Sequence, residues 1–433
     1  MRRLATPALL ASLALTAGCV VYDDPGYVIP DLSPVEGPVV APADGWDAPS
    51  FEAPDDRPGE QPLGKAKVAL LASSGDGSSA AGGEISFGPN GMAFAAWVVS
   101  DNGNGDIWLA CSTDGGETWD DPVPVETGAI PSVTGAERRP YVAVDAERVA
   151  VIWTSNPDPA TWVAIAERGE GPLVFGEPAF VGTADDHDME DFANGVFLST
   201  GELAVVTHST DFDRDPIDAL YLSRESDGWA PVEITEAVPG EPCECCALDL
   251  RATDDGGLQV VYRNNIDNVR DQFLLTITSD DQVSWSQVST TAWEIWGCPM
   301  QGPRMAALPN GDLAVVWGDP TAGENQIWMA RSTDGGVSWI DEHRVAPMDS
   351  EFQRWPRIAA DADGVLTVGY HTGTTVWATS SSDGGATFSE PVPVEVPEGQ
   401  LEIAELAVGP TGAAMVGTTG EQPDASVWFT PVQ

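Results

Sequence analysis

The chain contains one eight-residue segment three times, each copy directly after an apolar run that alternates like a strand. The copies are Ser112–Trp119, Ser332–Trp339 and Ser381–Phe388, and all of them carry Ser, Asp, two glycines and a closing aromatic residue in the same order. The alternating runs predict strands. The Asp and the glycine pair suit a tight turn in which glycine takes a positive φ. Each copy therefore predicts a hairpin turn, and their recurrence predicts a repeat architecture.

These segments resemble the Asp-boxes, or BNR repeats, of sialidases and related propellers. Weaker forms occur at residues 167–175, 223–229 and 279–285. Aligning the copies gives a unit of about four strands, which is the size of a propeller blade. The two-strand pattern that opens each unit recurs seven times, with openings near Glu84, Arg139, Asp191, Ala247, Arg304, Arg357 and Ile403.

We therefore predict an all-β fold, a seven-bladed β-propeller of sialidase-like type. The last unit lacks a fourth strand, and Lys67–Ala72 stands alone ahead of the first unit, so this N-terminal strand is expected to close the seventh blade. A six-bladed ring with the seventh unit outside it is the alternative. The 45 Gly, 35 Pro and 16 Trp residues favour turn-rich sheets over long helices.

The residues ahead of the propeller predict export. Residues 1–18 have the basic start and apolar stretch of a signal peptide. Leu15–Cys19 resembles a bacterial lipobox, which would make Cys19 the site of lipidation. Residues 19–64 are rich in Pro, Gly and Asp and predict a disordered tether, and residues 65–433 are the propeller. We expect an exported lipoprotein of the bacterial cell envelope, at the outer membrane or cell surface; a simple secreted protein is the alternative.

The charge of the chain restricts its partners. Its formal net charge is −49, with 68 acidic residues against 19 Lys and Arg. Nucleic acids and anionic membrane surfaces would be repelled. We expect a monomer that contacts the membrane only through its lipid anchor and binds a glycan or protein ligand.

The binding site is expected on the face opposite the Asp-boxes, where the loops between blades emerge. Arginine and aromatic residues gather in or beside these loops, and tryptophan side chains stack on sugar rings. The candidate ligand-binding residues are Arg138, Arg139, Trp296, Arg304, Trp355, Arg357 and His371.

Catalysis of the sialidase type is the alternative function. Sialidases bind the substrate carboxylate with three arginines and use a tyrosine assisted by a glutamate as nucleophile and an aspartate as acid/base. The resemblance suggests as candidates Arg139, Arg304, Arg357, Asp188, Asp191, Tyr262 and Tyr370. The Arg-Ile-Pro segment that opens the first blade of sialidases is absent, and these residues do not match the family motif by motif.

The cysteines suggest either a disulfide or a metal site. Cys243, Cys245 and Cys246 precede the fourth unit and Cys298 precedes the fifth, so the four can meet at one rim. In an exported protein a disulfide is expected, most simply between Cys298 and one of the other three. With Met300 these soft ligands would instead suit copper or zinc, although no regular zinc spacing is present.

The same cysteines resemble those of a subgroup of bacterial sialidase-like lipoproteins with Cys-x-Cys-Cys and Gly-Cys-Pro motifs. That resemblance implies no activity, and Met300 stands where the subgroup has histidine. Calcium is a further possible ligand, because Asp211, Asp213 and Asp215 alternate as in calcium loops, although the glycine and distal glutamate of an EF-hand are missing. Phosphate-binding, dinucleotide-binding, serine hydrolase and metalloprotease motifs are absent from the sequence.

Overall fold

The fold comes from a computed structural model. It describes residues 69–73, 79–101, 104–132, 137–156, 159–169, 171–182, 188–211, 217–297, 299–347, 351–397, 404–409, 412–419 and 426–432. The signal peptide and tether expected in residues 1–64 lie outside the described residues, as does Cys19.

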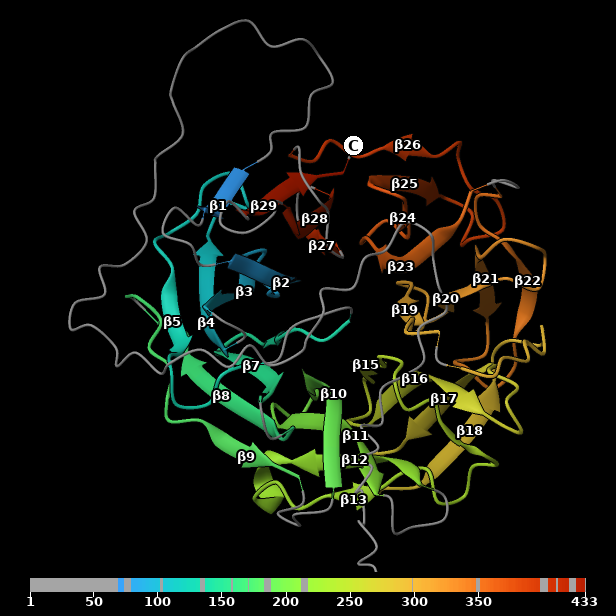
Figure 1. The fold of residues 1–433 in the computed structure, drawn as a ribbon, viewed down its shortest axis with the longest axis horizontal. Helices are drawn as coiled ribbons and strands as arrows, with labels where there is room; N and C mark the ends of the chain where they lie inside the picture. Colours follow the sequence, from blue (N-terminus) through green and yellow to red (C-terminus); the bar gives the residue numbers. More distant parts are fainter. Residues whose placement is uncertain are drawn as a thin grey trace, which may run out of the picture.

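Seven antiparallel sheets are arranged in a ring, as Figure 1 shows. In six of the sheets the chain runs from the centre of the ring outward, and in the seventh it does so over the first three strands. The innermost strands are β2 (Ser79–Phe87), β6 (Tyr141–Val144), β10 (Asp188–Phe197), β15 (Asp249–Ala252), β19 (Arg304–Ala307), β23 (Gln353–Ala360) and β27 (Glu405–Gly409). The second strands are β3 (Ala93–Asp101), β7 (Arg148–Thr154), β11 (Leu203–Asp211), β16 (Leu258–Asn265), β20 (Leu313–Asp319), β24 (Leu366–Thr372) and β28 (Gly412–Thr419).

The outer half of each sheet completes a blade. The third strands are β4 (Asn104–Ser112), β8 (Thr161–Glu167), β12 (Asp218–Arg224), β17 (Gln272–Ile277), β21 (Gln326–Ser332), β25 (Thr375–Ser381) and β29 (Ser426–Pro431). The outermost strands are β5 (Val123–Glu126), β9 (Ala179–Val181), β13 (Val232–Glu233), β18 (Val283–Gln287), β22 (Ile340–Arg344), β26 (Val392–Pro393) and β1 (Ala69–Ser73). Two short elements remain: β14 (Glu241–Pro242), which pairs with β16, and the 3-10 turn η1 (Glu225–Asp227).

The seventh sheet combines strands that are far apart in the sequence. β1 pairs antiparallel with β29, and the order of the sheet is β1-β29-β28-β27. The strand expected to stand ahead of the first unit therefore lies at the outside of the last blade. Seven sheets confirm the seven-bladed fold, and the six-bladed alternative is wrong. No described helix is long and apolar enough to cross a membrane.

The core lies between neighbouring sheets. In five blades the second strand carries a large aromatic residue at the same register position, and all five are almost fully buried: Trp97, Trp153, Tyr262, Trp317 and Tyr370. Their rings pack in apolar clusters formed with residues of adjacent blades. These aromatics therefore hold the blades together.

The three clear Asp-boxes form the hairpin turns that the sequence predicts. In the box of the fifth blade the Ser332 hydroxyl donates to the Asp334 carboxylate at 2.8 Å and accepts from the backbone N–H of Gly336 at 2.7 Å. Asp334 in turn accepts from the backbone N–H of Ser338 at 2.9 Å. The boxes at Ser112 and Ser381 repeat these bonds. The motif is therefore satisfied within the turn itself.

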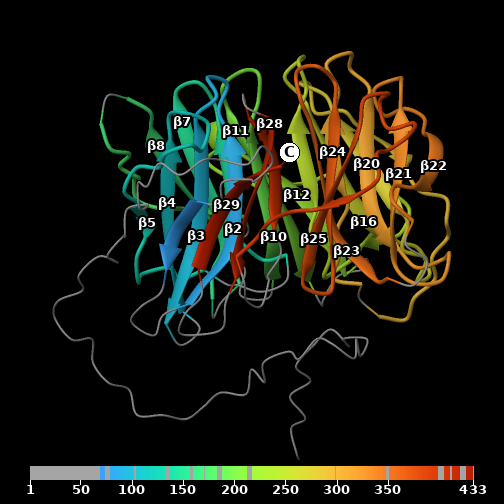
Figure 2. The same cartoon turned by 90° about the horizontal axis from the view of Figure 1, so that it is seen from above.

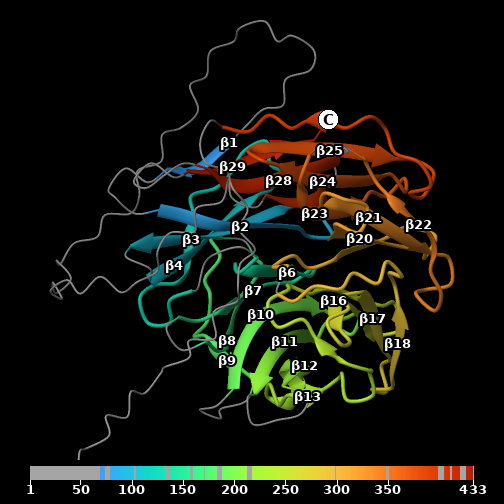
Figure 3. The same cartoon turned by 45° about the vertical axis from the view of Figure 1, so that its right-hand side comes forward.

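The strand order also sets which loops share a face. Figures 2 and 3 show the strands running between the two faces of the ring. Because successive strands are antiparallel, the Asp-box turns lie at the opposite end of the strands from the loops that lead from one blade into the next. We call the face with the blade-connecting loops the connecting face.

Candidate functional site

The innermost strands place one residue each at a common level around the centre of the ring. In every blade this residue pairs with the same position of the second strand, which is the residue directly before the one that is aromatic and buried in five blades. All seven are polar: Glu84, Tyr141, Asn194, Asp249, Arg304, Arg357 and Glu405. Aligning this single position in the sequence repeats would have revealed it, whereas sequence analysis singled out only the two arginines.

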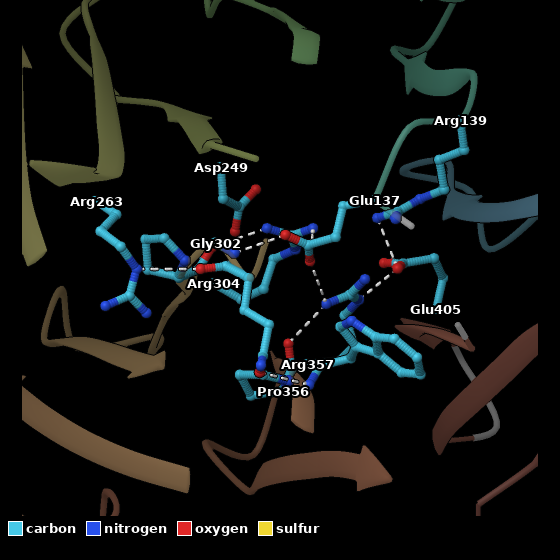
Figure 4. Close-up of polar contacts among 12 residues, drawn as sticks. Glu137, Arg139, Asp249, Arg263, Gly302, Arg304, Pro356, Arg357 and Glu405 are labelled. Carbon is cyan, nitrogen blue, oxygen red and sulfur yellow. Dashed lines mark hydrogen bonds and ion pairs between the residues drawn. The ribbon is translucent and has the colours of Figure 1, made fainter. Parts of the chain in front are cut away.

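Most of these polar groups join a network that we call the central charge cluster. It consists of Glu84, Glu137, Arg139, Arg304, Arg357 and Glu405, all of them buried. Figure 4 shows Glu137 and Arg139, which both precede β6, and Arg304, Arg357 and Glu405 from three other blades, all pointing toward one another. The structure thus brings the three arginines expected from the sequence together.

Glu137 is held by two of the arginines. Its Oε1 accepts hydrogen bonds from Arg304 Nη2 and Arg357 Nη1, both at 3.1 Å, and its Oε2 accepts from the backbone N–H of Gly302 at 2.6 Å. Burial raises the pKa of this carboxyl, but the guanidinium groups of Arg304 and Arg357 outweigh burial and leave the pKa below its ordinary value. Glu137 is therefore a firmly ionised carboxylate at the centre of the ring.

Glu84 and Glu405 hold the third arginine. Arg139 donates from Nε to Glu84 Oε2 at 2.7 Å, and its Nη2 lies 2.6 Å from Glu405 Oε1. Arg357 Nε also donates to Glu405. Burial raises the pKa of Glu84 from 4.5 to about 7 despite Arg139. Three guanidinium groups thus face three carboxyl groups, one of which titrates near neutral pH.

Tyr141 stands beside this cluster and was not among the tyrosines expected from the sequence. The Arg139 guanidinium lies 5.1 Å from the centre of its ring. Its hydroxyl has no hydrogen-bond partner in the described part of the chain. Burial raises the pKa of Tyr141 above its ordinary value, although Arg139 and Arg304 act in the opposite direction.

Three of the innermost strands, β2, β10 and β23, are bulged just before they reach the central level. The register shifts between Asp191 and Asn194 in β10 and between Arg354 and Arg357 in β23. The residue at each bulge has a left-handed backbone, with φ of 49° at Phe192 and 52° at Trp355. In β2 the same position is Gly82, with φ of 63°. Glycine adopts this conformation without strain, whereas a bulky aromatic residue does not.

An arginine packs on each of these strained aromatics. The Arg138 guanidinium lies 5.3 Å from the ring centre of Phe192, and that of Arg354 lies 4.4 Å from the ring centre of Trp355. Trp296, in the loop before β19, is 80% exposed. Arg138 and Trp296 lie in blade-connecting loops and Arg354 and Trp355 among the first residues of β23, so these four share the connecting face, whereas Phe192 lies further along β10 and is buried under Arg138. We call Arg138, Phe192, Trp296, Arg354 and Trp355 the rim cluster.

The structure places the remaining candidate catalytic residues apart from the arginines. Tyr262 and Tyr370 are buried between blades in apolar clusters, and burial alone raises the pKa of each. They were expected near a site because they end second strands, but their side chains face the neighbouring blade. Asp191 forms an ion pair with Arg138, and burial raises its pKa in spite of that pair. Asp188 begins β10, and its side chain lies outside the described part.

His371 is a support for Trp355 in this structure rather than an exposed group. It is 1% exposed, and the edge of its ring meets Trp355 at a centroid distance of 5.3 Å. Its Nε2 accepts a hydrogen bond from the backbone N–H of Ala404 at 3.3 Å. Burial, with Arg357 and Arg354, lowers its pKa to about 3, so the ring is neutral.

The cysteines are partly bonded. Cys245 is disulfide-bonded and therefore offers no thiolate to a metal, whereas Cys243 and Cys246 are free. Cys298 lies outside the described residues, so the expected pairing with it stays a prediction. Met300 packs against the three neighbouring cysteines.

The described residues add no candidate metal ligands to those expected from the sequence. Within them, no group of three or more His, Cys, Asp or Glu side chains is arranged to hold a metal ion. Of the three aspartates considered for calcium, Asp213 and Asp215 fall outside the described ranges.

Comparisons with known proteins were made for sequence and for structure. Residues 91–368 match the family of BNR repeat-like domains. No curated protein sequence matches the chain.

Among solved structures, the chain is similar to a Trypanosoma rangeli sialidase in complex with 2,3-difluorosialic acid. The identity is 11% and the TM-score 0.46, and the alignment covers 81% of this chain and 53% of the sialidase. It is also similar to a Penicillium chrysogenum alpha-L-arabinanase complexed with arabinobiose, with 15% identity, a TM-score of 0.46 and coverage of 84% and 98%. A protein of unknown function from Dyadobacter fermentans gives 13% identity, a TM-score of 0.47 and coverage of 84% and 99%.

Proposed function

We propose that this chain, which belongs to the family of BNR repeat-like domains, binds an acidic glycan at the rim cluster on its connecting face. The observation that carries the proposal is backbone strain. Phe192 and Trp355 hold left-handed conformations at equivalent positions of two blades. Such conformations cost about 1–3 kcal/mol each and cluster at binding and active sites. Glycine at the equivalent Gly82 shows that the fold itself does not need an aromatic residue there.

The chemistry of the rim cluster suits an acidic sugar. Aromatic rings stack on the apolar face of a sugar ring, and guanidinium groups bind carboxylates through charge-assisted hydrogen bonds. Arg354 with Trp355 supplies both kinds of group within one pair, and Trp296 adds an exposed aromatic surface. Arg138 already forms an ion pair with Asp191, so Arg354 is the guanidinium that we expect a ligand carboxylate to approach. The net charge of −49 disfavours general attraction of anions and so favours a specific ligand.

The test is calorimetric titration of the protein with a sialylated oligosaccharide, its methyl ester and its desialylated parent. We expect the acid to bind at least tenfold more tightly than the ester and the parent. Equal affinity for all three would remove the role of the arginines. Absence of binding across a wider panel of acidic glycans would refute the proposal.

Hydrolysis of sialosides is a second candidate, and Tyr141 favours it. This tyrosine is buried beside Arg139 of the central charge cluster, and the carboxyl groups of Glu84 and Glu405 lie near it. Sialidases, which the sequence repeats resemble, use a tyrosine with a neighbouring glutamate next to three arginines. The ion pairs of Arg139, Arg304 and Arg357 with the protein's own carboxylates count against it, because a substrate would have to displace them.

A fluorogenic sialoside separates the two candidates. Release of the fluorophore by the wild type, with its loss in Tyr141→Phe, would establish hydrolysis. Binding of sialylated glycans without release would leave the binding function alone.

A further inference from the structure

We propose that Cys243 and Cys246 form a reversible dithiol–disulfide pair, a site of oxidative modification directly beneath the rim cluster. The two sulfur atoms lie 2.7 Å apart, which is much closer than an ordinary contact between unbonded sulfurs. Both cysteines are free and buried in the structure. The pair is separate from the disulfide of Cys245.

The backbone holds the two sulfurs together. The N–H of Cys246 donates to the carbonyl of Cys243 at 3.1 Å, which closes a four-residue turn. The N–H of Cys243 donates to the carbonyl of Arg263 at 2.8 Å, so β16 anchors the first cysteine. A bond between cysteines three residues apart in such a turn therefore requires movement of the sulfurs and little movement of the chain.

The surroundings distinguish the two thiols. Burial raises the pKa of Cys243, but the hydrogen bond from Cys246 and the charge of Arg270 outweigh burial and leave it below its ordinary value. Burial and the Cys243 sulfur raise the pKa of Cys246 well above its ordinary value. The step itself rests on the contact between the sulfurs: a disulfide formed at Cys243 lies within reach of the Cys246 sulfur.

The oxidant we name is a low-molecular-weight disulfide. The Cys243 thiolate attacks one of its sulfurs, forms a mixed disulfide and expels one thiolate. Cys246 then releases its proton and its sulfur displaces the second thiolate, which leaves the Cys243–Cys246 bond. Two electrons pass from the protein to the reagent, whose one disulfide becomes two thiols. Because the pair is buried, the turn must open for the first attack, and we expect slow exchange.

The cysteine pair is relevant to the rim cluster because it packs against Phe192, one of the rim residues. Cys243 and Cys246 share an apolar cluster with Phe192 and Met300. Phe192 is a strained rim residue, and Met300 also has a left-handed backbone, with φ of 51°. A bond within the turn would fix the packing beneath both.

Peptide mapping tests the pair on the full chain. The protein is equilibrated with oxidised glutathione or with dithiothreitol, denatured, alkylated and digested after glutamate. Cleavage after Glu244 separates Cys243 from Cys246, so a bond between them would join two peptides. Cys245 stays in the peptide of Cys246, so fragmentation of the joined peptides must show which of the two is bonded to Cys243. We expect this joined pair after oxidation and two alkylated cysteines after reduction. Cys111, a free thiol in another blade, is the internal control and is alkylated in both samples.

A Cys246→Ser variant provides the matched comparison. It should lose the joined peptides. After oxidation Cys243 should carry glutathione as a trapped mixed disulfide, because no second thiol can displace it, and after reduction Cys243 should be alkylated. The proposal is overturned if Cys243 and Cys246 of the oxidised wild type are both alkylated, whether the protein carries copper or zinc or no metal. A bond from either cysteine to any other peptide overturns it as well.

Discussion

Glu137 is the residue on which most of the central charge cluster depends. It accepts hydrogen bonds from Arg304, Arg357 and Gly302, which come from other blades and lie more than 160 residues away in the sequence. Local sequence patterns cannot reveal such a partner. The sequence could therefore suggest that three arginines meet, but not that the protein's own carboxylates neutralise them.

Replacing Glu137 by glutamine should be strongly destabilising. The change keeps the shape of the side chain but leaves Arg304 and Arg357 without their shared counter-charge in a buried site. Breaking a buried ion pair in this way costs about 3–5 kcal/mol. Urea unfolding monitored by tryptophan fluorescence measures the loss. Arg224→Ala, which removes an ion pair to the exposed Asp281, is the control and should cost under about 1 kcal/mol.

Glu84 should make stability depend on pH. Its folded pKa of about 7 lies above the ordinary 4.5, so its stabilising contribution is complete below pH 4.5 and is lost as the pH rises through 7. In Glu84→Gln this loss is absent. Between pH 4.5 and 7.5 the wild type should lose about 3 kcal/mol relative to the variant. Parallel stability curves for the two proteins over this range would contradict the shifted pKa.

The Asp-box is an element whose turn could be predicted from the sequence, whereas its packing against the preceding blade could not. The sequence predicts the hairpin turn, and the structure confirms it. The second glycine of each box, however, lies against the third strand of the preceding blade. A Cβ atom at Gly336 would come within 2.3 Å of Leu274, one at Gly116 within 2.3 Å of Phe429, and one at Gly385 within 2.1 Å of Met329. The repeated spacing of the box is therefore also a requirement of blade packing.

Alanine substitutions at the paired glycines of one box should separate strain from packing. Gly335 and Gly336 both have positive φ, of 74° and 94°. No atom lies within 4 Å of a Cβ at Gly335, so Gly335→Ala carries only backbone strain of about 1–2 kcal/mol. Gly336→Ala adds the clash with Leu274 and should cost clearly more. Thermal unfolding of both variants measures the difference, and equal melting temperatures would exclude the packing role.

No sequence pattern predicts the bulges at Phe192 and Trp355. A left-handed backbone normally indicates glycine or asparagine, and neither residue is present there. Only the shifted register of β10 and β23 against their neighbours reveals them. Trp355 was nevertheless a candidate ligand-binding residue, because its aromatic side chain lies in a blade-connecting loop region.

At the scale of the whole molecule, the number of blades and their order follow from the sequence because each repeat is a local unit. What surrounds the centre depends on contacts between repeats. Tyr262 and Tyr370 illustrate the limit: their place at the end of second strands was correct, yet the direction of their side chains, into the core between blades, was not.

The net charge of −49 should make the fold sensitive to salt. Repulsion among surface carboxylates opposes the folded state and is screened over about 10 Å at 0.1 M ionic strength. The buried pairs of the central charge cluster are screened much less. Raising sodium chloride from 0.02 to 0.5 M should therefore raise the melting temperature. A falling melting temperature would mean that exposed ion pairs contribute more than the repulsion does.

The most direct test of the rim cluster compares glycan affinity between the wild type and Trp355→Gly. Glycine relieves the strained backbone at φ of 52° but removes the ring that packs on His371 and Arg354, so thermal unfolding is used to check that the variant is folded. Trp285→Ala, on the outermost strand β18, is the control for loss of an exposed tryptophan. We expect Trp355→Gly to bind sialylated oligosaccharide at least tenfold more weakly than the wild type and Trp285→Ala to bind it equally well. Unchanged affinity in a well-folded Trp355→Gly would show that the rim cluster is not the binding site.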